Sequence, residues 1–288
     1  MLTAGGVDSG LQVIDTMLHI RKNTIKIGVA KPVKIFHMTD SHLPFYCDSD
    51  SENMIRQGKK RNMKKSLRNF NRLIRYAEKN CDVIIHTGDL IDYISKPCVE
   101  FAKAFLEREN ILLVAGNHEY AKYDGKKEDM DYRLQSMKEI GGYGVNIFMN
   151  SRIVDGVNFV GVDDAYHQVE YEQLDFLKKE VEKGYPVILF LHAPLYEKVL
   201  YKKSYDFWNG EICLLGSDTT VHTEVVGDIA EPFASTKSFY EYVINEPRIK
   251  AVLAGHLHFW YEGTLPDGKK QYVTNRGDKG NARVITII

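Results

Sequence analysis

The chain has 288 residues, of which 44% are hydrophobic and 27% are charged, and its formal net charge is −1. This composition supplies a sizeable core for one large domain or two small ones. The near-neutral balance excludes a global electrostatic attraction to nucleic acid or to an anionic membrane.

No apolar run reaches the roughly 18 residues of a transmembrane helix, and residues 1–10 lack the basic-then-apolar order of a secretory signal. We therefore expect a cytoplasmic protein with no membrane partner.

The four cysteines form no C-x-x-C pair, and we expect them to be reduced, buried thiols. They are Cys47, Cys81, Cys98 and Cys213.

Residues 1–30 mix loose helical spacing with strand-like alternation, and we expect a peripheral arm or an edge strand there. From Val33 onward, short apolar strands alternate with amphipathic helices. The predicted elements are a strand at 33–38, a helix at 57–80, a strand at 83–86, a helix at 97–110 and a strand at 111–115. This order implies right-handed crossovers and a mainly parallel sheet, whose ligands bind outside the carboxyl ends of the strands.

The second half is richer in strands. Strand-like segments occur at 146–149, 152–154, 157–162, 187–191, 250–254, 259–263, 271–274 and 283–287, and a helical segment at 170–183. We predict an α/β (α+β) fold, a four-layer αββα sandwich of two mixed β-sheets flanked by helices. The whole chain, 1–288, would form a single domain with its catalytic core from about residue 33.

Residues 195–235 fit no regular element and contain several aromatic side chains. A long irregular segment inside a compact domain is usually functional, so we predict a lid or insert loop. The alternative is a surface insertion that packs on its own aromatics.

Polar segments follow five of the predicted strands. Each carries carboxylate, amide or imidazole groups, which are ligands for hard and borderline metal ions. The segments are Asp40-Ser41-His42, Gly88-Asp89-Leu90-Ile91-Asp92, Gly116-Asn117-His118-Glu119, His192-Ala193-Pro194 and Gly255-His256-Leu257-His258. Metal ligands placed at several strand ends predict a two-metal hydrolytic site, in which a carboxylate can bridge both ions.

In this order the five segments give D-x-H, G-D-x-x-D, G-N-H-E, H and G-H-x-H, which resembles the calcineurin-like metallophosphoesterases. The resemblance implies a first metal held by Asp40, His42 and His258, and a second held by Asn117, His192 and His256, with Asp89 bridging the two. It also implies a catalytic histidine at His118 that assists the leaving group, oriented by Asp92. Hydroxide bridging the metals would then attack the phosphorus of a phosphodiester or phosphomonoester.

Departures from particular branches of that family bear on the substrate. Protein Ser/Thr phosphatases carry the motif G-D-x-V-D-R-G at the second segment, but this chain has Tyr93 at the position of the arginine. Purple acid phosphatases carry a metal-bound tyrosine where this chain has Asp92. The sequence looks most like bacterial phosphohydrolases of the cyclic-nucleotide-phosphodiesterase type, which predicts a small-molecule or nucleotide substrate.

Nitrogen and oxygen ligands suit manganese, iron or zinc, and we expect two divalent ions, with manganese supporting activity best. For the substrate we single out Trp208, which could stack on a nucleobase or aryl group, and Arg276, which could contact phosphate.

Two alternatives stay open. Nine basic residues and no acid lie between Arg56 and Arg75, which would suit a nuclease for DNA or RNA unless they form a solvated outer face. The other alternative is a non-catalytic scaffold that keeps the fold.

Overall fold

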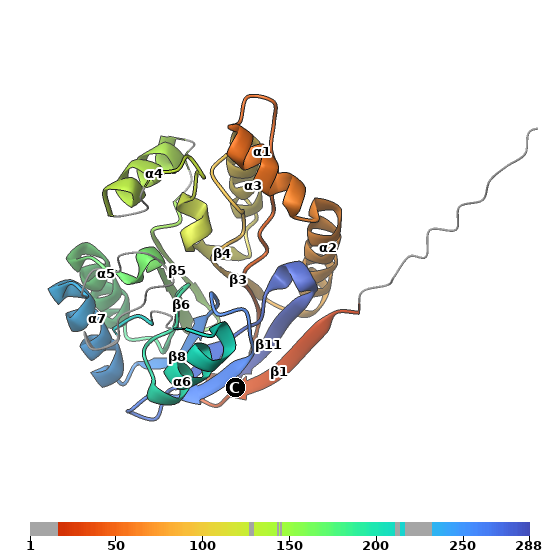
Figure 1. Cartoon of the computed structure of the whole chain (residues 1–288). Coiled ribbons are helices and arrows are strands. Elements are labelled where there is room, and N and C mark those ends of the chain that lie inside the picture. Colours follow the sequence, from red (N-terminus) through yellow and green to blue (C-terminus); the bar gives the residue numbers. More distant parts are fainter. Residues whose placement is uncertain (1–16, 127–129, 143, 145, 211–213, 217–231) are drawn as a thin grey trace, which may run out of the picture.

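The computed structural model of the protein describes residues 17–126, 130–142, 144, 146–210, 214–216 and 232–288, and contains two mixed β-sheets (Figure 1). The first sheet has the order β1 (His19–Ile25), β11 (Asn281–Ile287), β2 (Val33–Met38), β3 (Val83–Thr87) and β4 (Ile111–Val114). The second has the order β5 (Met149–Val154), β6 (Val157–Val162), β7 (Val187–Phe190), β8 (Ile249–Ala254), β10 (Lys270–Val273) and β9 (Tyr261–Thr264). Strands β2, β3 and β4 run parallel in the first sheet, and β6, β7 and β8 run parallel in the second. This direction aligns the carboxyl ends of each set at one edge.

Three apolar clusters define four layers. Side chains such as Ile35 of β2 and Phe159 of β6 meet between the two sheets. The outer face of the first sheet packs on α2 (Met63–Asn80) and α3 (Lys96–Leu106), and that of the second on α5 (Tyr171–Glu182) and α7 (Ala234–Asn245). Figure 1 shows these helix pairs on opposite sides of the molecule. The predicted αββα sandwich is therefore confirmed.

The amphipathic pattern predicts one helix over 57–80, but the structure has two. Helix α1 (Glu52–Lys60) begins earlier, because the Ser51 side chain caps it by accepting the amide N–H of Met54. It ends at Arg61, and α2 begins at once, because the side chain of Asn62 accepts the amide N–H of Lys65. Two local caps thus divide a continuous amphipathic pattern.

The segment 195–235 contains a regular element that the sequence pattern does not predict. Helix α6 (Lys198–Trp208) begins where both carboxylate oxygens of Glu197 accept amide N–H groups, and it ends at Asn209, whose φ is 54°. Residues 211–213 and 217–231 of the predicted lid lie outside the described residues. Helices α4 (Met130–Gly142) and α7 were also unpredicted.

Strand β1 forms the edge of the first sheet, which is one of the two forms expected for residues 1–30. It faces the edge of the second sheet, because Arg21 lies 4.7 Å from the Trp260 ring centroid and Asn23 donates a hydrogen bond to Glu262. Residues 1–16 of the predicted arm lie outside the described residues.

In the described part of the chain, no helix is both long and apolar enough to cross a membrane.

Cys98 is a buried free thiol, as expected, and burial raises its pKa to about 12. Cys47 and Cys81 are half-buried, so the expectation of burial is wrong for them, and Cys213 lies outside the described residues.

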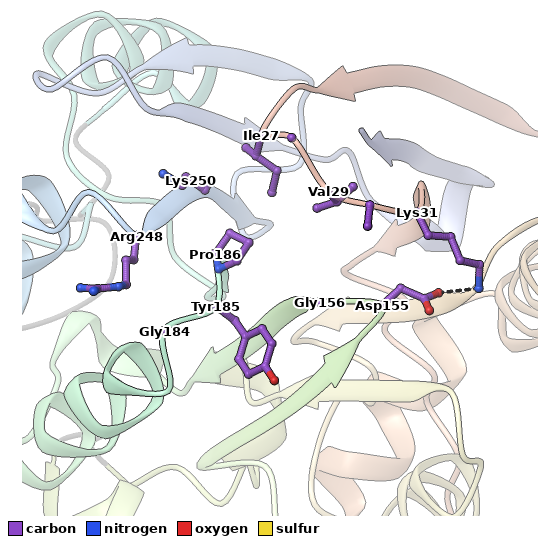
Figure 2. Close-up of a pocket in the computed structure, with 12 residues that line it drawn as sticks. Ile27, Val29, Lys31, Asp155, Gly156, Gly184, Tyr185, Pro186, Arg248 and Lys250 are labelled. Carbon is purple, nitrogen blue, oxygen red and sulfur yellow. Dashed lines mark hydrogen bonds and ion pairs between the residues drawn. The ribbon is translucent and has the colours of Figure 1, made fainter.

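A cavity of about 640 Å³ lies between the sheets at the amino ends of β6, β7 and β8 (Figure 2). Its polar groups do not converge: Lys31 pairs with Asp155, while Arg248 and Lys250 point away from that pair. Predicted metal ligands follow the opposite, carboxyl ends of β7 and β8. This cavity is therefore separate from the candidate site.

One buried ion pair ties α4 to the end of β6. Arg133 and Asp163 have fully buried side chains, and the Arg133 Nη2 lies 2.7 Å from the Asp163 Oδ2. The Tyr120 hydroxyl donates to the same oxygen at 2.7 Å.

Because a buried charge without its partner is costly, Asp163→Asn is expected to lower the free energy of unfolding by about 3–5 kcal/mol. Urea denaturation measures this loss. Glu100→Gln, which removes the exposed partner of Lys96, serves as the control and should leave stability nearly unchanged. Equal effects of the two variants would contradict the role given to the buried pair.

Candidate dimetal site

The structure brings all seven predicted ligands together at the carboxyl ends of five strands. Asp40, Asp89, His192 and His256 each lie two residues beyond β2, β3, β7 and β8, and Asn117 opens the short 3-10 helix after β4. Parallel strands that end at one edge explain why ligands so distant in sequence become neighbours.

Four of these side chains form a first cluster whose donor atoms all lie within 4.8 Å of one another. The Nε2 of His258 lies 3.1 Å from both the Nε2 of His42 and the Oδ1 of Asp40. The Oδ2 of Asp89 lies 3.7 Å from the Nε2 of His42. This cluster contains the first predicted ligand set and the predicted bridge.

The second predicted set surrounds the Nε2 of His192. That atom lies 3.2 Å from the Oδ1 of Asn117 and 3.2 Å from the Nδ1 of His256. The Oδ2 of Asp89 lies 3.5 Å away and therefore faces both clusters. A carboxylate oxygen in this position can ligate two ions at once.

The surroundings of the imidazoles fit metal ligation. The Nδ1 of His192 lies 2.7 Å from the carbonyl oxygen of Thr87, which can only accept a hydrogen bond, so the Nε2 of the neutral ring carries a lone pair. The Nδ1 of His42 also faces an acceptor, the Asp92 carboxylate at 3.2 Å, although this contact lacks the geometry of a hydrogen bond. A cation between such facing acceptors would satisfy them, and outer carbonyls and carboxylates commonly orient metal-binding histidines in this way.

Backbone strain is concentrated in the same residues. Five of the seven predicted ligands have φ between 42° and 66°, a left-handed region that costs a non-glycine residue about 1–3 kcal/mol. They are Asp40, His42, Asp89, His256 and His258. Such strain persists where the surrounding structure holds each side chain in one direction, as a metal site requires.

Two glycines allow the turns after β3 and β4 to approach each other closely. Gly88 has φ of 84°, and a Cβ there would lie 2.5 Å from the backbone nitrogen of Gly116. A Cβ on Gly116 would in turn collide with the carboxylate of Asp89. The turns after β3 and β4 can therefore touch only as glycines.

The electrostatics of the cluster favour bound positive charge. Burial by itself would raise the pKa of Asp40 and Asp89, but the neighbouring histidines outweigh it and lower the pKa of both carboxyls. Burial would lower the pKa of His192, but the charges of Asp89 and Asp40 outweigh it and raise that pKa. The donor set thus fits two divalent cations.

His118 lies beside the clusters with a side chain that is 20% exposed. Its Nδ1 lies 3.2 Å from the Oδ1 of Asp92 and 3.0 Å from the Asp92 carbonyl oxygen. Burial would lower the pKa of His118, but the charges of Asp89 and Asp92 raise it to about 10. This is the geometry expected for an acid oriented by a carboxylate.

Two carboxylates that hold the site together were not identified in the sequence. Buried Glu119 accepts amide N–H groups from Asp89, Leu90, Ile91 and Gly116 at 2.6–3.1 Å. Burial and the charge of Asp89 raise the pKa of Glu119 to about 7. Asp164 similarly accepts the amide N–H of His192 at 2.8 Å. Glu119 closes the G-N-H-E segment, but only the fold reveals which amides it meets.

The two predicted substrate residues, Trp208 and Arg276, contact different partners. The Trp208 ring lies 5.6 Å from that of His258, and the residue is 37% exposed, which places it at the rim of the first cluster. Arg276 follows β10, and its Nε and Nη2 bind the carboxylate of Asp278 at 2.6 and 2.7 Å. The structure adds Arg61, whose Nη2 lies 2.8 Å from the Oδ1 of Asp92.

Fold and site together define a dimetal phosphoesterase-like protein. Residues 33–259 match the family model of the calcineurin-like phosphoesterases, and the chain belongs to that family. No curated protein matches the sequence.

Solved structures with a similar fold include a dimetal phosphatase from Danio rerio, which is 15% identical over 88% of this chain and 92% of its own, with a TM-score of 0.52. Protein TT1561 of Thermus thermophilus is 12% identical over 86% of this chain and 91% of its own, with a TM-score of 0.46. At 15% identity the likeness to the Danio rerio phosphatase concerns the fold alone.

The Glu119 contacts generate a prediction about metal affinity. Glu119→Gln keeps the shape but replaces one acceptor oxygen with a donor NH₂ that would face an amide N–H. We expect metal affinity to fall about 10- to 100-fold, as for other residues that support ligands. Isothermal titration with Mn²⁺ measures it, with Glu197→Gln, at the α6 cap, as the control. Unchanged affinity would contradict the role given to Glu119.

Proposed function

We propose that this protein is a metal-dependent phosphoesterase that hydrolyses a phosphodiester or phosphomonoester. The observation that supports this most directly is the position of Asp89 Oδ2, which faces His42 at 3.7 Å and His192 at 3.5 Å. A shared carboxylate between two donor clusters is the arrangement that a two-metal hydrolase needs.

In this proposal the first ion is held by Asp40, His42 and His258, the second by Asn117, His192 and His256, and Asp89 bridges them. When bound, the two cations would lower the pKa of a water molecule and neutralise the phosphoryl oxygens. Manganese, iron and zinc all suit these donors, and we propose manganese for activity.

His118 would hold the proton for the leaving oxygen. Its Nδ1 faces Asp92, so its Nε2, 4.0 Å from the Asp89 carboxylate, is the ring atom directed toward the reacting group. Bound cations would lower the pKa of this imidazole from its value of about 10 toward the working pH, which is where a general acid is most effective.

A nuclease is less well supported than an enzyme for small esters. Met54 and Gly58 mark the buried face of α1, whereas Arg56, Lys59 and Lys60 are exposed on its other side. These cations form an outer face rather than a lining of the site. We therefore propose a nucleotide or another small phosphate ester as substrate. The single domain, the lid and the cytoplasmic location remain predictions.

The decisive test is hydrolysis of bis-p-nitrophenyl phosphate and p-nitrophenyl phosphate by protein loaded with Mn²⁺. We expect turnover of at least one ester, and a fall in kcat of about 100-fold or more in His118→Ala, because a positioned proton donor is lost. Metal content, measured by elemental analysis, should stay at two ions per chain. No turnover of either ester by the loaded protein would favour the scaffold alternative.

The predicted substrate residues generate a second prediction. Trp208→Ala and Arg276→Ala should each raise KM several-fold with little change in kcat, because they would bind the substrate away from the reacting atoms. Tyr171→Ala, at an exposed aromatic residue on α5, is the matched control. Steady-state kinetics that do not distinguish these variants from the control would remove Trp208 and Arg276 from the substrate site.

A further inference from the structure

Arg61 lies at the junction of α1 and α2, where its backbone is held on both sides. Its amide N–H donates to the carbonyl oxygen of Gln57 at 3.1 Å, and its own carbonyl oxygen accepts the amide N–H of Met63 at 3.0 Å. Neighbouring Lys59 and Lys60 are exposed on α1, whereas the Arg61 side chain is only 24% exposed. Arg61 therefore leaves the outer basic face and turns inward from a fixed point.

The inward-turned guanidinium holds the carboxylate of Asp92. The Nε of Arg61 donates a hydrogen bond to the Oδ2 of Asp92 at 3.1 Å, and the Nη2 lies 2.8 Å from the Oδ1. The carboxylate is fully buried, and its Oδ1 has no hydrogen-bond donor among the described residues. A buried carboxylate is costly unless a charge or a donor compensates it, and Arg61 supplies both.

The orientation of this carboxylate decides what two histidines of the site face. A carboxylate turns readily about its Cβ–Cγ bond, because the torsion at such a bond has broad minima. With the Oδ2 held by Arg61, the Oδ1 lies 3.2 Å from the Nδ1 of His42 and 3.2 Å from the Nδ1 of His118. In the described part of the chain, neither contact is a hydrogen bond that would fix the oxygen by itself. The contact with Arg61 therefore selects the rotation in which one oxygen faces both imidazoles.

We propose, on the basis of the proposed function, that Arg61 is a positioning residue, which holds the Asp92 carboxylate in the orientation that serves His42 and His118. His118 is the proposed acid and His42 a proposed metal ligand, so one guanidinium supports both through one carboxylate. A planar guanidinium that meets both carboxylate oxygens suits this role, since it constrains the plane of the carboxylate as well as its position.

The same geometry limits how Arg61 can act. The Asp92 carboxylate lies between Arg61 and the two imidazoles, so the influence of Arg61 on the site passes through that carboxylate. Burial would lower the pKa of Arg61, but the charge of Asp92 outweighs it and raises that pKa, so the guanidinium keeps its charge. A residue that acts through another in this way should change the rate of the chemical step more than the binding of substrate.

The test is a double-mutant cycle, with kinetics on the better p-nitrophenyl ester at saturating Mn²⁺ and Mn²⁺ affinity by isothermal titration calorimetry. Arg61→Ala should lower kcat about tenfold, because the carboxylate loses its orientation, and should leave KM within about twofold. Mn²⁺ affinity should fall several-fold, since His42 loses a support. In an Asp92→Ala background the same substitution should change neither kcat nor Mn²⁺ affinity further.

Two variants control for charge and for folding. Arg61→Lys keeps the charge but lacks the planar fork, so kcat should recover only in part. Lys60→Ala removes a neighbouring exposed cation and should leave kcat and Mn²⁺ affinity within about twofold of the original protein. Thermal melting shows whether each variant is folded, and Arg61→Lys takes the place of Arg61→Ala in the cycle if the latter is not.

Unchanged kcat and Mn²⁺ affinity in a folded Arg61→Ala would overturn the proposal. A raised KM with an unchanged kcat would also overturn it, because Arg61 would then bind the substrate itself. Equal losses with and without the Asp92 side chain, or in Lys60→Ala, overturn it as well. If the loaded protein hydrolyses neither ester, the proposed function fails, but Mn²⁺ affinity still tests the positioning role: a fall that depends on Asp92 supports it, and no fall overturns it.

Discussion

The rest of the site depends on one buried carboxylate, that of Asp89, lying between two groups of imidazoles. A carboxylate that is 2% exposed is stable only where positive charge or donors surround it. Here His42 and His192 approach its Oδ2 at 3.7 and 3.5 Å, and the amide N–H of His118 donates to its Oδ1 at 2.9 Å. Glu119 then binds the amide of Asp89 itself and that of Gly116. Two neighbouring strand ends are thereby held in one rigid unit.

The sandwich is what makes this constraint possible. Parallel strands of both sheets end at the same edge, so the left-handed turns that aim the ligands are anchored on buried strands rather than on free loops. The apolar layer between the sheets and the helical layers outside them hold those strand ends in place. Strain at the site is therefore offset by burial elsewhere, which is common where function requires a particular geometry.

Asp92 is a second buried carboxylate, and it connects the site to the helices. Its side chain is fully buried and meets His42, His118 and Arg61 at 2.8–3.2 Å. It links a proposed metal ligand, a proposed acid and a cation that enters from the junction of α1 and α2. A change at the junction of α1 and α2 would thus affect the site through the Asp92 carboxylate.

The sequence by itself determined the layer order and the identity of the clustered donors, because periodicity marks the strands and the polar segments follow them directly. It could not reveal the break in the helix at Arg61, since a continuous amphipathic pattern conceals two local caps. Nor could it assign Glu119 or Asp164, because their partners are backbone amides of other segments, which carry no sequence signal. Only the tertiary structure decided which charged groups meet. Ion pairs such as Arg61 with Asp92 join residues from different elements, and their contact depends on where those elements pack.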